Sequence, residues 1–240
     1  MLSIVDLLAA KTLDLDLAAY LMARISTGAS FMVGSVPGGA GKTTVMCALL
    51  NFVPIDVRLI AATPQAVHNA AKAPPWVCYV CHEIGSGAYF AYLWAGALQR
   101  YCRLFECGHM LATNLHADDP EQAKDQICGV NDVPTDHFNR FELLVFLRID
   151  GDYVKMDRWI EEVYSGDGSS GQTLAFRASE EKRIGPGDRH YLADSQYVAA
   201  CRDFLETMPG NVRTIEQTRR NVVEFLKQHP SRRTQLTDRS

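Results

Sequence analysis

Residues 37–44, Pro37-Gly38-Gly39-Ala40-Gly41-Lys42-Thr43-Thr44, form a glycine-rich stretch that runs into a lysine and two threonines. The apolar run ASFMVG at 29–34 precedes it and predicts a short buried strand. The run TTVMCALLN at 43–51 predicts the start of a helix. A glycine-rich turn between a strand and a helix N-terminus presents backbone N–H groups to phosphate oxygens. The stretch is therefore typical of a phosphate-binding P-loop.

This loop predicts a site for a nucleoside triphosphate and Mg²⁺; we expect ATP as the nucleotide, although the loop alone does not choose between ATP and GTP. Lys42 would reach the outer phosphates, and the Thr43 hydroxyl would hold the metal. The glycine that the motif expects five residues before Gly41 is Val36, and Gly34 is the candidate for that sharp turn in a longer loop. A turn that binds nothing is the alternative. The expected nucleotide-binding residues are Gly38, Gly39, Ala40, Gly41, Lys42, Thr43 and Thr44.

Composition limits the class of protein. A chain of 240 residues with 47% hydrophobic residues fits one globular domain, or one domain with a small appendage. The net charge of −4 argues against a protein that coats nucleic acid, so no nucleic-acid partner is expected. No apolar run has the length of a membrane span, and the N-terminus lacks a signal-peptide pattern. Seven cysteines without a disulfide-rich pattern favour a reducing compartment, so we expect a cytoplasmic protein.

A group of cysteines and histidines raises the alternative of a zinc site. Cys78 and Cys81 lie in an expected strand, where side chains three residues apart point to opposite faces. Buried free cysteines are therefore the favoured interpretation. The residues considered are Cys78, Cys81, Cys102, Cys107, His82 and His109.

Apolar segments alternate between strand and helix patterns along most of the chain. This alternation predicts an α/β fold, with a mostly parallel sheet, helices on both faces and a small C-terminal helical appendage. The expected regions are a P-loop core at 1–168, a linker at 169–194 and the appendage at 195–240. After the strand at 29–34, strands are expected at 57–62, 76–81, 110–114, 143–149 and 155–164, the last pairing antiparallel with 143–149. Helices are expected at 15–26, 88–105, 121–128, 195–208 and 215–229, and Ser3 with Asp6 predicts a capping box before a short first helix.

Two further residues are candidates for catalysis. Glu83 follows the buried run VCYVC, at the Walker B position, where a carboxylate can orient the Mg²⁺ shell or activate water. His116 follows the strand at 110–114, and ligands bind at strand ends in open α/β sheets. We therefore predict Glu83 and His116 as catalytic residues, with Thr43 and Glu83 at the metal. A solvated glutamate and a structural histidine are the alternatives.

Together these residues resemble the secretion ATPase superfamily, the motors of type II and type IV secretion, type IV pili and archaella. The resemblance runs from about Ser3 to Gly168 and is closest to the archaeal branch. It consists of the P-loop, an apolar strand ending in Glu83, and a His box, with a lead-in at 3–26 and a closing hairpin at 143–164. The His box is Gly108-His109 followed by Asn114-Leu115-His116-Ala117.

The resemblance implies a RecA-like P-loop ATPase core that powers or regulates the assembly of a pilus, archaellum or secretion machine. It also implies self-association into a hexameric ring and a membrane platform protein as partner. The protein would then be cytoplasmic and peripheral at the inner face of the membrane through that partner.

Three departures bear on hydrolysis. The acidic pair of the family's Asp box is replaced by Ala61-Ala62, and the arginine that follows the Walker B glutamate is missing after Glu83. The family's large N-terminal domain has no counterpart in the 33 residues before Gly34. These departures predict slow hydrolysis and keep open a degenerate, non-motor nucleotide-binding regulator or scaffold. A small-molecule or nucleotide kinase is a third hypothesis, but the sequence has no cluster of arginines that would form a lid over the phosphates.

Overall fold

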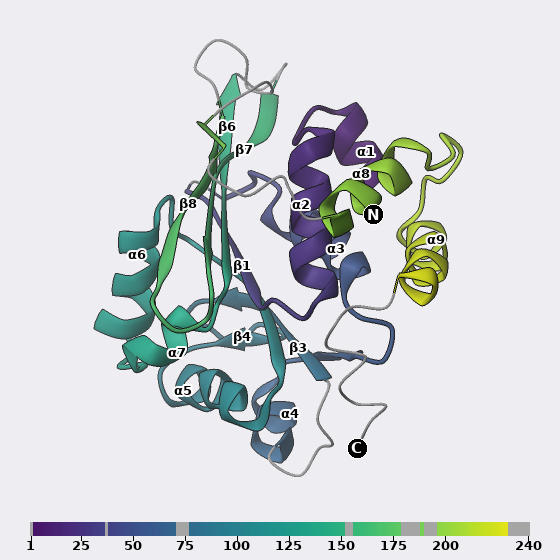
Figure 1. The fold of residues 1–240 in the computed structure, drawn as a ribbon. Helices are drawn as coiled ribbons and strands as arrows, with labels where there is room; N and C mark the ends of the chain where they lie inside the picture. The colour runs from purple at the N-terminus through teal and green to yellow at the C-terminus, as the bar shows by residue number, and fades with distance from the viewer. Residues whose placement is uncertain are drawn as a thin grey trace.

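The computed structural model describes residues 2–36, 38–70, 77–151, 156–178, 188–189 and 196–229. Its centre is one sheet with the strand order β2-β3-β5-β1-β6-β7-β8-β9, and β4 pairs with β3. Strands β1 to β6 run parallel to one another, and β7, β8 and β9 continue the sheet with antiparallel pairing from β6 onward (Figure 1). The strands are β1 (Phe31–Gly34), β2 (Arg58–Ala61), β3 (Val77–Ile84), β4 (Tyr92–Leu93), β5 (Met110–Leu115), β6 (Leu143–Gly151), β7 (Met156–Gly166), β8 (Gln172–Arg177) and β9 (Asp188–Arg189).

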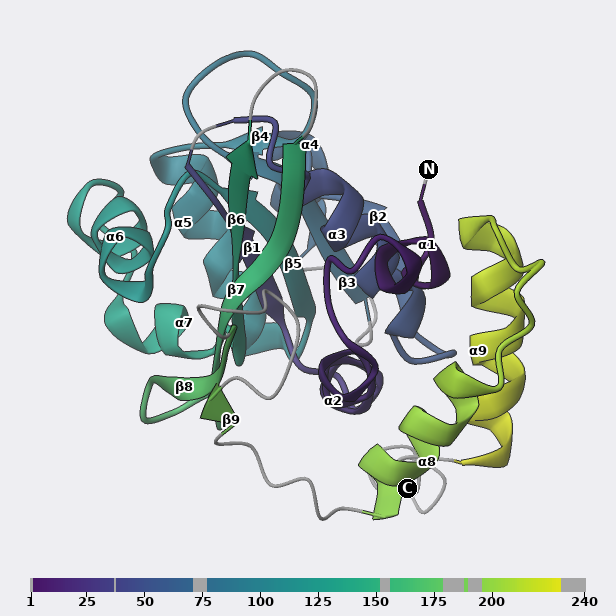
Figure 2. The same cartoon turned by 90° about the horizontal axis from the view of Figure 1, so that it is seen from above.

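Helices cover both faces of the sheet, as the alternation predicted (Figure 2). One face carries α1 (Ile4–Ala9), α2 (Leu15–Ser26), α3 (Lys42–Leu49), α8 (Gln196–Glu206) and α9 (Ile215–Gln228). The other face carries α4 (Pro64–Asn69), α5 (Gly96–Arg103), α6 (Pro120–Lys124) and α7 (Thr135–Asn139). Between these helices lie the 3₁₀ turns η1 (Leu50–Phe52) and η3 (Leu104–Cys107), and the π-helical turn η4 (Asp125–Gly129). None of the helices in the described residues is both long and apolar enough to cross a membrane.

Two apolar clusters, one on each side of the sheet, hold the layers together. Alternate residues of β1 divide between them: Phe31 and Val33 face α2 and α3, and Met32 faces the α5 side. Cys78 and Cys81 divide in the same way, which confirms that they point to opposite faces. In the described part of the chain, no group of three or more His, Cys, Asp or Glu side chains could hold a metal ion.

The ends of several helices follow from short polar signals. Ser3 and Asp6 form the predicted capping box of α1, and Asp14 accepts a hydrogen bond from the backbone of Leu17 at the start of α2. Thr214 with Gln217 forms a second capping box, at α9. These caps satisfy backbone N–H groups that no helical carbonyl can reach.

Two segments differ from the expected elements. The helix expected at 88–105 begins only at Gly96, because Tyr92 and Leu93 extend beside the end of β3 as β4. Residues 172–177, inside the expected linker at 169–194, form β8, which pairs with β7; residues 179–187 and 190–194 lie outside the described residues.

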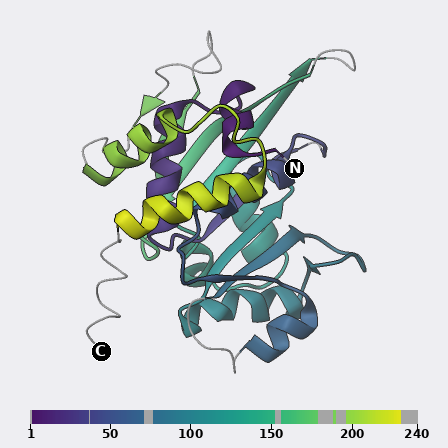
Figure 3. The ribbon, with the colours of Figure 1, turned by 90° about the vertical axis from the view of Figure 1, so that its right-hand side faces the viewer.

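The C-terminal helices are present and pack on the α2 face, where α9 lies outermost (Figure 3). Cys201, Leu205, Val222 and Phe225 belong to the same apolar cluster as the first strand and helix α2. The part of the expected appendage at 230–240 lies outside the described residues.

Candidate nucleotide-binding site

The glycine-rich loop joins the carboxyl end of β1 to the first residue of α3. Gly39 and Gly41 have φ values of +88° and +96°, in the left-handed region that side chains with a Cβ rarely adopt. Gly41 is the N-cap of α3 and provides no side-chain cap for it. The first turn of α3 therefore begins without the side-chain oxygen that caps α1, α2 and α9, as expected of a helix end that receives an anion.

Gly34 is required here for a different reason from the one expected. Its φ is not positive, so it does not make the turn that the motif assigns to glycine. A Cβ at Gly34 would lie 2.5 Å from the carbonyl oxygen of Ala117 and 2.8 Å from Cδ1 of Phe146. Gly34 thus permits close approach of β1 to the chain after β5 and to β6.

Lys42 lies at the centre of the site and is 6% exposed. Its Nζ is 3.3 Å from Nδ1 of His116, 3.5 Å from the carbonyl oxygen of Ser35 and 3.8 Å from Oε2 of Glu83. His116 Nε2 in turn lies 4.0 Å from Glu83 Oε1. The three side chains predicted from separate parts of the sequence therefore meet at one point.

The sheet order brings them together. Strand β5 lies between β1 and β3, so the end of β5, which His116 follows, is adjacent both to the loop that leads to Lys42 and to the strand that carries Glu83. The strand expected at 76–81 extends to Ile84. Glu83 therefore lies within β3, where it pairs with Tyr92 of β4, rather than after the strand. All three residues lie at the carboxyl edge of the parallel strands, where open α/β sheets bind their ligands.

Burial changes the proton affinities of all three groups. It raises the pKa of Glu83 to about 7, although the Lys42 ammonium opposes this shift. It also lowers the pKa of Lys42, with Glu83 and Asp118 opposing. Burial and the neighbouring Lys42 lower the pKa of His116, which favours the neutral imidazole near neutral pH.

The Thr43 hydroxyl lies beside a second group of polar atoms. Asn114 Nδ2 donates to Thr43 Oγ1 at 3.3 Å and to the carbonyl of His82 at 2.9 Å. His82 Nε2 is 3.5 Å from the same hydroxyl. Glu83 Oε1 and Asn114 Oδ1 are buried without a hydrogen-bond partner among the described residues. These oxygens fit a Mg²⁺ that takes few protein ligands and is completed by phosphate and water.

The comparisons with known proteins bear on the fold alone. No protein-family model matches the sequence, and no curated protein matches it. The structure is similar to the crystal structure of the VirB11 ATPase from the Brucella suis type IV secretion system in complex with sulphate, with 19% sequence identity and a TM-score of 0.47. The match covers 62% of this chain and 52% of that chain, so this chain corresponds to about half the length of the solved structure. The archaeal branch stays a prediction.

The rest of the expected nucleotide-binding residues surround Lys42. Gly38 lies near His116, whose Cε1 is 3.9 Å from the position of a Cβ on that glycine. Ala40 is 2% exposed, and its methyl group belongs to the core cluster, so only its backbone can face a ligand. Thr44 is partly exposed in the first turn of α3.

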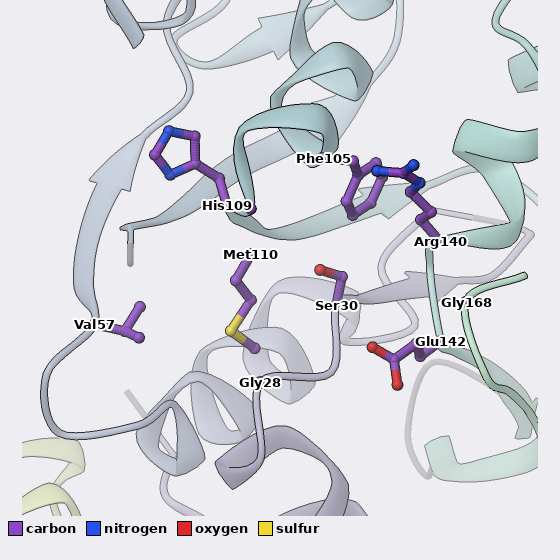
Figure 4. A pocket seen from close by; sticks show the side chains of 10 residues that line it. Gly28, Ser30, Val57, Phe105, His109, Met110, Arg140, Glu142 and Gly168 are labelled. Carbon is purple, nitrogen blue, oxygen red and sulfur yellow. The ribbon is translucent and has the colours of Figure 1, made fainter. Parts of the chain in front are cut away.

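The first half of the His box lies elsewhere. His109 precedes β5, at the amino edge of the sheet, and contacts Tyr79 edge to face. It lines a cavity of about 300 Å³ at the starts of β1, β5 and β6, opposite the edge that carries Lys42 (Figure 4). The two histidines of the His box therefore lie at opposite edges of the sheet, because the whole length of β5 separates them. The cavity is lined by Gly28, Ser30, Val57, Phe105, Gly108, His109, Met110, Arg140, Glu142 and Gly168.

Three side chains at the site were not predicted as site residues. Asp118 Oδ1 accepts a 2.6 Å hydrogen bond from the backbone N–H of Val36, and Asn114 orders the Thr43 hydroxyl. Arg158, from β7, donates through Nε to the carbonyl of Gly39 at 3.2 Å. Asp118 and Asn114 flank His116 in sequence, which was a usable signal. Nothing in the sequence around Arg158 relates it to residue 39, more than a hundred positions earlier.

The two alanines at the position compared with the Asp box lie at the end of β2 and directly after it. Ala61 ends β2, and Ala62 is fully buried in the apolar cluster beneath α4 and α5. Strand β2 therefore presents methyl groups beside β3, at the edge where Glu83 lies. In the described residues, the carboxylate of Glu83 lies near the ammonium of Lys42 and the imidazole of His116.

Proposed function

We propose that this protein binds Mg·ATP in the loop between β1 and α3 and hydrolyses it slowly. The convergence of Lys42, Glu83 and His116 on that loop supports this proposal. A buried ammonium beside a buried carboxylate is expensive to maintain without a further ligand. A bound triphosphate supplies the negative charge that Lys42 is placed to meet, because the P-loop lysine reaches the outer phosphates.

Glu83 is the proposed proton acceptor. A general base works best when its pKa is near the operating pH, and burial raises the pKa of Glu83 to about 7. Neutral His116 would donate a hydrogen bond toward the outer phosphate oxygens. Thr43 and Glu83 are the proposed ligands of Mg²⁺, which when bound would neutralise phosphate charge.

The biological role that we propose follows the sequence resemblance. The protein would power or regulate the assembly of a pilus, archaellum or secretion machine. It would be a cytoplasmic subunit that self-associates, with a hexameric ring as the expected form. Its expected partner is a membrane platform protein. Ala61 and Ala62, which leave β2 without a carboxylate, favour a second candidate, a nucleotide-binding regulator or scaffold with little turnover. Steady-state turnover with and without Mg²⁺ separates the two roles.

Calorimetry of Mg·ATP binding tests the proposal directly. Lys42→Ala should weaken binding by about ten- to a hundredfold, since a charge-assisted contact to phosphate is worth about 1.5–3 kcal/mol. Lys124→Ala, which removes an exposed lysine of α6, is the matched control and should bind as the wild type does. Equal affinities of the wild type and Lys42→Ala would exclude this loop as the nucleotide site.

A further inference from the structure

Strand β7 places two side chains beside the P-loop, on the side away from Glu83. Arg158 Nε donates to the Gly39 carbonyl at 3.2 Å, and Arg158 Cδ lies 3.6 Å from the position of a Cβ on Gly41. The arginine side chain therefore lies against the loop at Gly39 and Gly41.

Met156 lies on the same face of β7 as Arg158, two residues before it. Arg158 Nη2 donates to Met156 Sδ at 3.0 Å, so the guanidinium and the thioether are in direct contact. Arg158 is exposed, and Met156 is 37% exposed although it is apolar. Arg158 Nη1 forms no hydrogen bond within the described residues. The two side chains thus leave an open, partly apolar surface next to the loop.

The sheet order shows on which side of the loop this surface lies. Glu83 and His116 belong to β3 and the end of β5, on one side of β1, and Arg158 belongs to β7, on the other side. In the proposed site the outer phosphates would lie at Lys42, whose ammonium is close to His116 and Glu83 on the first side. The nucleoside, at the other end of the nucleotide, would then extend toward the β7 side of the loop.

We infer that Arg158 and Met156 form the platform on which the base of the bound nucleotide stacks. This inference rests on the proposed function of the same loop. A planar guanidinium stacks on aromatic faces, and a thioether makes favourable contacts with aromatic rings. The contact is to the flat face of the base, so it provides affinity for a purine without choosing between adenine and guanine.

The test compares ATP with inorganic triphosphate, which has the phosphates and lacks the base. Calorimetry with Mg²⁺ gives the affinity of each, and their ratio isolates the contribution of the nucleoside, because a change in loop charge or loop shape affects both ligands. Arg158→Ala should lower this ratio by about tenfold and Met156→Ala by about threefold. Arg148→Ala, which removes an exposed arginine of β6 in the same hairpin, should leave it unchanged.

The outcomes separate the inference from the function on which it rests. A wild-type protein that binds neither ligand, or a Lys42→Ala variant that binds both normally, would reject the nucleotide site itself. If wild type binds both and Arg158→Ala loses equal affinity for ATP and triphosphate, Arg158 acts on the phosphates or the loop, and the base platform is wrong. An unchanged ratio in Arg158→Ala and Met156→Ala also overturns it. Melting temperatures close to wild type, expected for two exposed positions, exclude unfolding as the cause of a change.

Discussion

At the residue scale, the site contains two buried ionisable side chains, Lys42 and Glu83. Lys42 and Glu83 have side chains that are 7% and 9% exposed, and they lie 3.8 Å apart, longer than a direct hydrogen bond. Burial therefore outweighs their attraction, since Glu83 holds its proton more tightly and Lys42 less tightly than they do in water. The desolvation of these two charges costs free energy, and a charged ligand bound between them can offset that cost.

The first prediction concerns the pH dependence of hydrolysis. Below about pH 7 Glu83 is protonated and cannot accept a proton, so kcat/KM should rise as pH increases through about 7 and then level off. Glu83→Gln should bind Mg·ATP, lower turnover by about 10²- to 10⁴-fold and lose this pH dependence. Glu121→Gln, an exposed position of α6, serves as control. Wild-type turnover in Glu83→Gln would show that another group activates the water.

Glu83 also predicts how stability depends on pH. Its folded pKa, about 7, is above the ordinary value of 4.5, so between these values the folded state binds more protons than the unfolded state. Its contribution to stability should therefore decrease from about pH 4.5 to about pH 7 and stay constant above that. Urea unfolding should find Glu83→Gln more stable than wild type at pH 8, with a smaller difference at pH 5. A difference that grows toward low pH would contradict the raised pKa.

The close approach at Gly34 gives a third prediction. Gly34→Ala places a methyl group 2.5 Å from the Ala117 carbonyl oxygen, and this contact is relieved only if β1 or the chain after β5 moves. We expect a loss of about 1–3 kcal/mol in urea unfolding. Gly210→Ala, where nothing lies within 4 Å of the added Cβ, is the control. Equal stability of the two variants would mean that the strands separate at little cost.

At the element scale, Arg219 of helix α9 adds hydrogen bonds to the apolar packing that holds this helix beside the turn after α3. Arg219 donates through Nη1 to the carbonyls of Asn51 and Val53 and through Nη2 to that of Pro54, at the turn that follows α3. Burial lowers the pKa of Arg219, yet three carbonyl partners keep its charge hydrogen-bonded. This docking links a C-terminal helix to the element that carries Lys42.

The fourth prediction tests that docking. Arg219→Ala should reduce the free energy of unfolding by about 1.5–3 kcal/mol, because three carbonyl groups lose a charged donor. Arg220→Ala removes the next residue, an exposed arginine that bonds to Glu216 of its own helix, and should change stability by less than about 0.5 kcal/mol. Hydrogen exchange in α9 should increase in the first variant only. Protection of α9 that survives Arg219→Ala would show that apolar packing alone holds the helix.

At the scale of the whole molecule, the C-terminal helices share the apolar core on one face of the central sheet. Phe225 stacks on Phe204, and both helices pack on the α2 side of the sheet. The cluster that contains them also contains Phe31 and Val33 of β1, the strand that leads into the P-loop. The described part of the chain therefore has one continuous apolar layer on this face.

The fifth prediction concerns self-association. If ATP binds an assembled state better than the free chain, mass action requires that nucleotide promotes assembly. Light scattering across protein concentrations should show a larger mass with Mg²⁺ and a non-hydrolysable ATP analogue than without them. A mass that stays monomeric at high concentration with the analogue bound would favour the regulatory role over the motor role.

Local sequence signals predicted much of the fold and part of the candidate site. The glycine-lysine-threonine core predicted the turn and the start of α3, since glycine conformation and helix ends are set within a few residues. Short continuous apolar runs predicted β1, β3, β5 and β6. The run at 88–105 misled, because apolar residues with aromatics fit either a helix or a strand beside β3, and only the neighbouring backbone decided.

The sequence by itself determined which chemistry is available: Lys42 after a glycine turn, a glutamate at the end of one buried strand and a histidine at the end of another. Only the tertiary structure decided that these residues meet, since the insertion of β5 between β1 and β3 is a matter of long-range pairing. The same pairing separated His109 from His116 and brought Arg158 to Gly39. Contacts across a sheet depend on strand order, and strand order is fixed by packing over the whole chain rather than by any one segment of it.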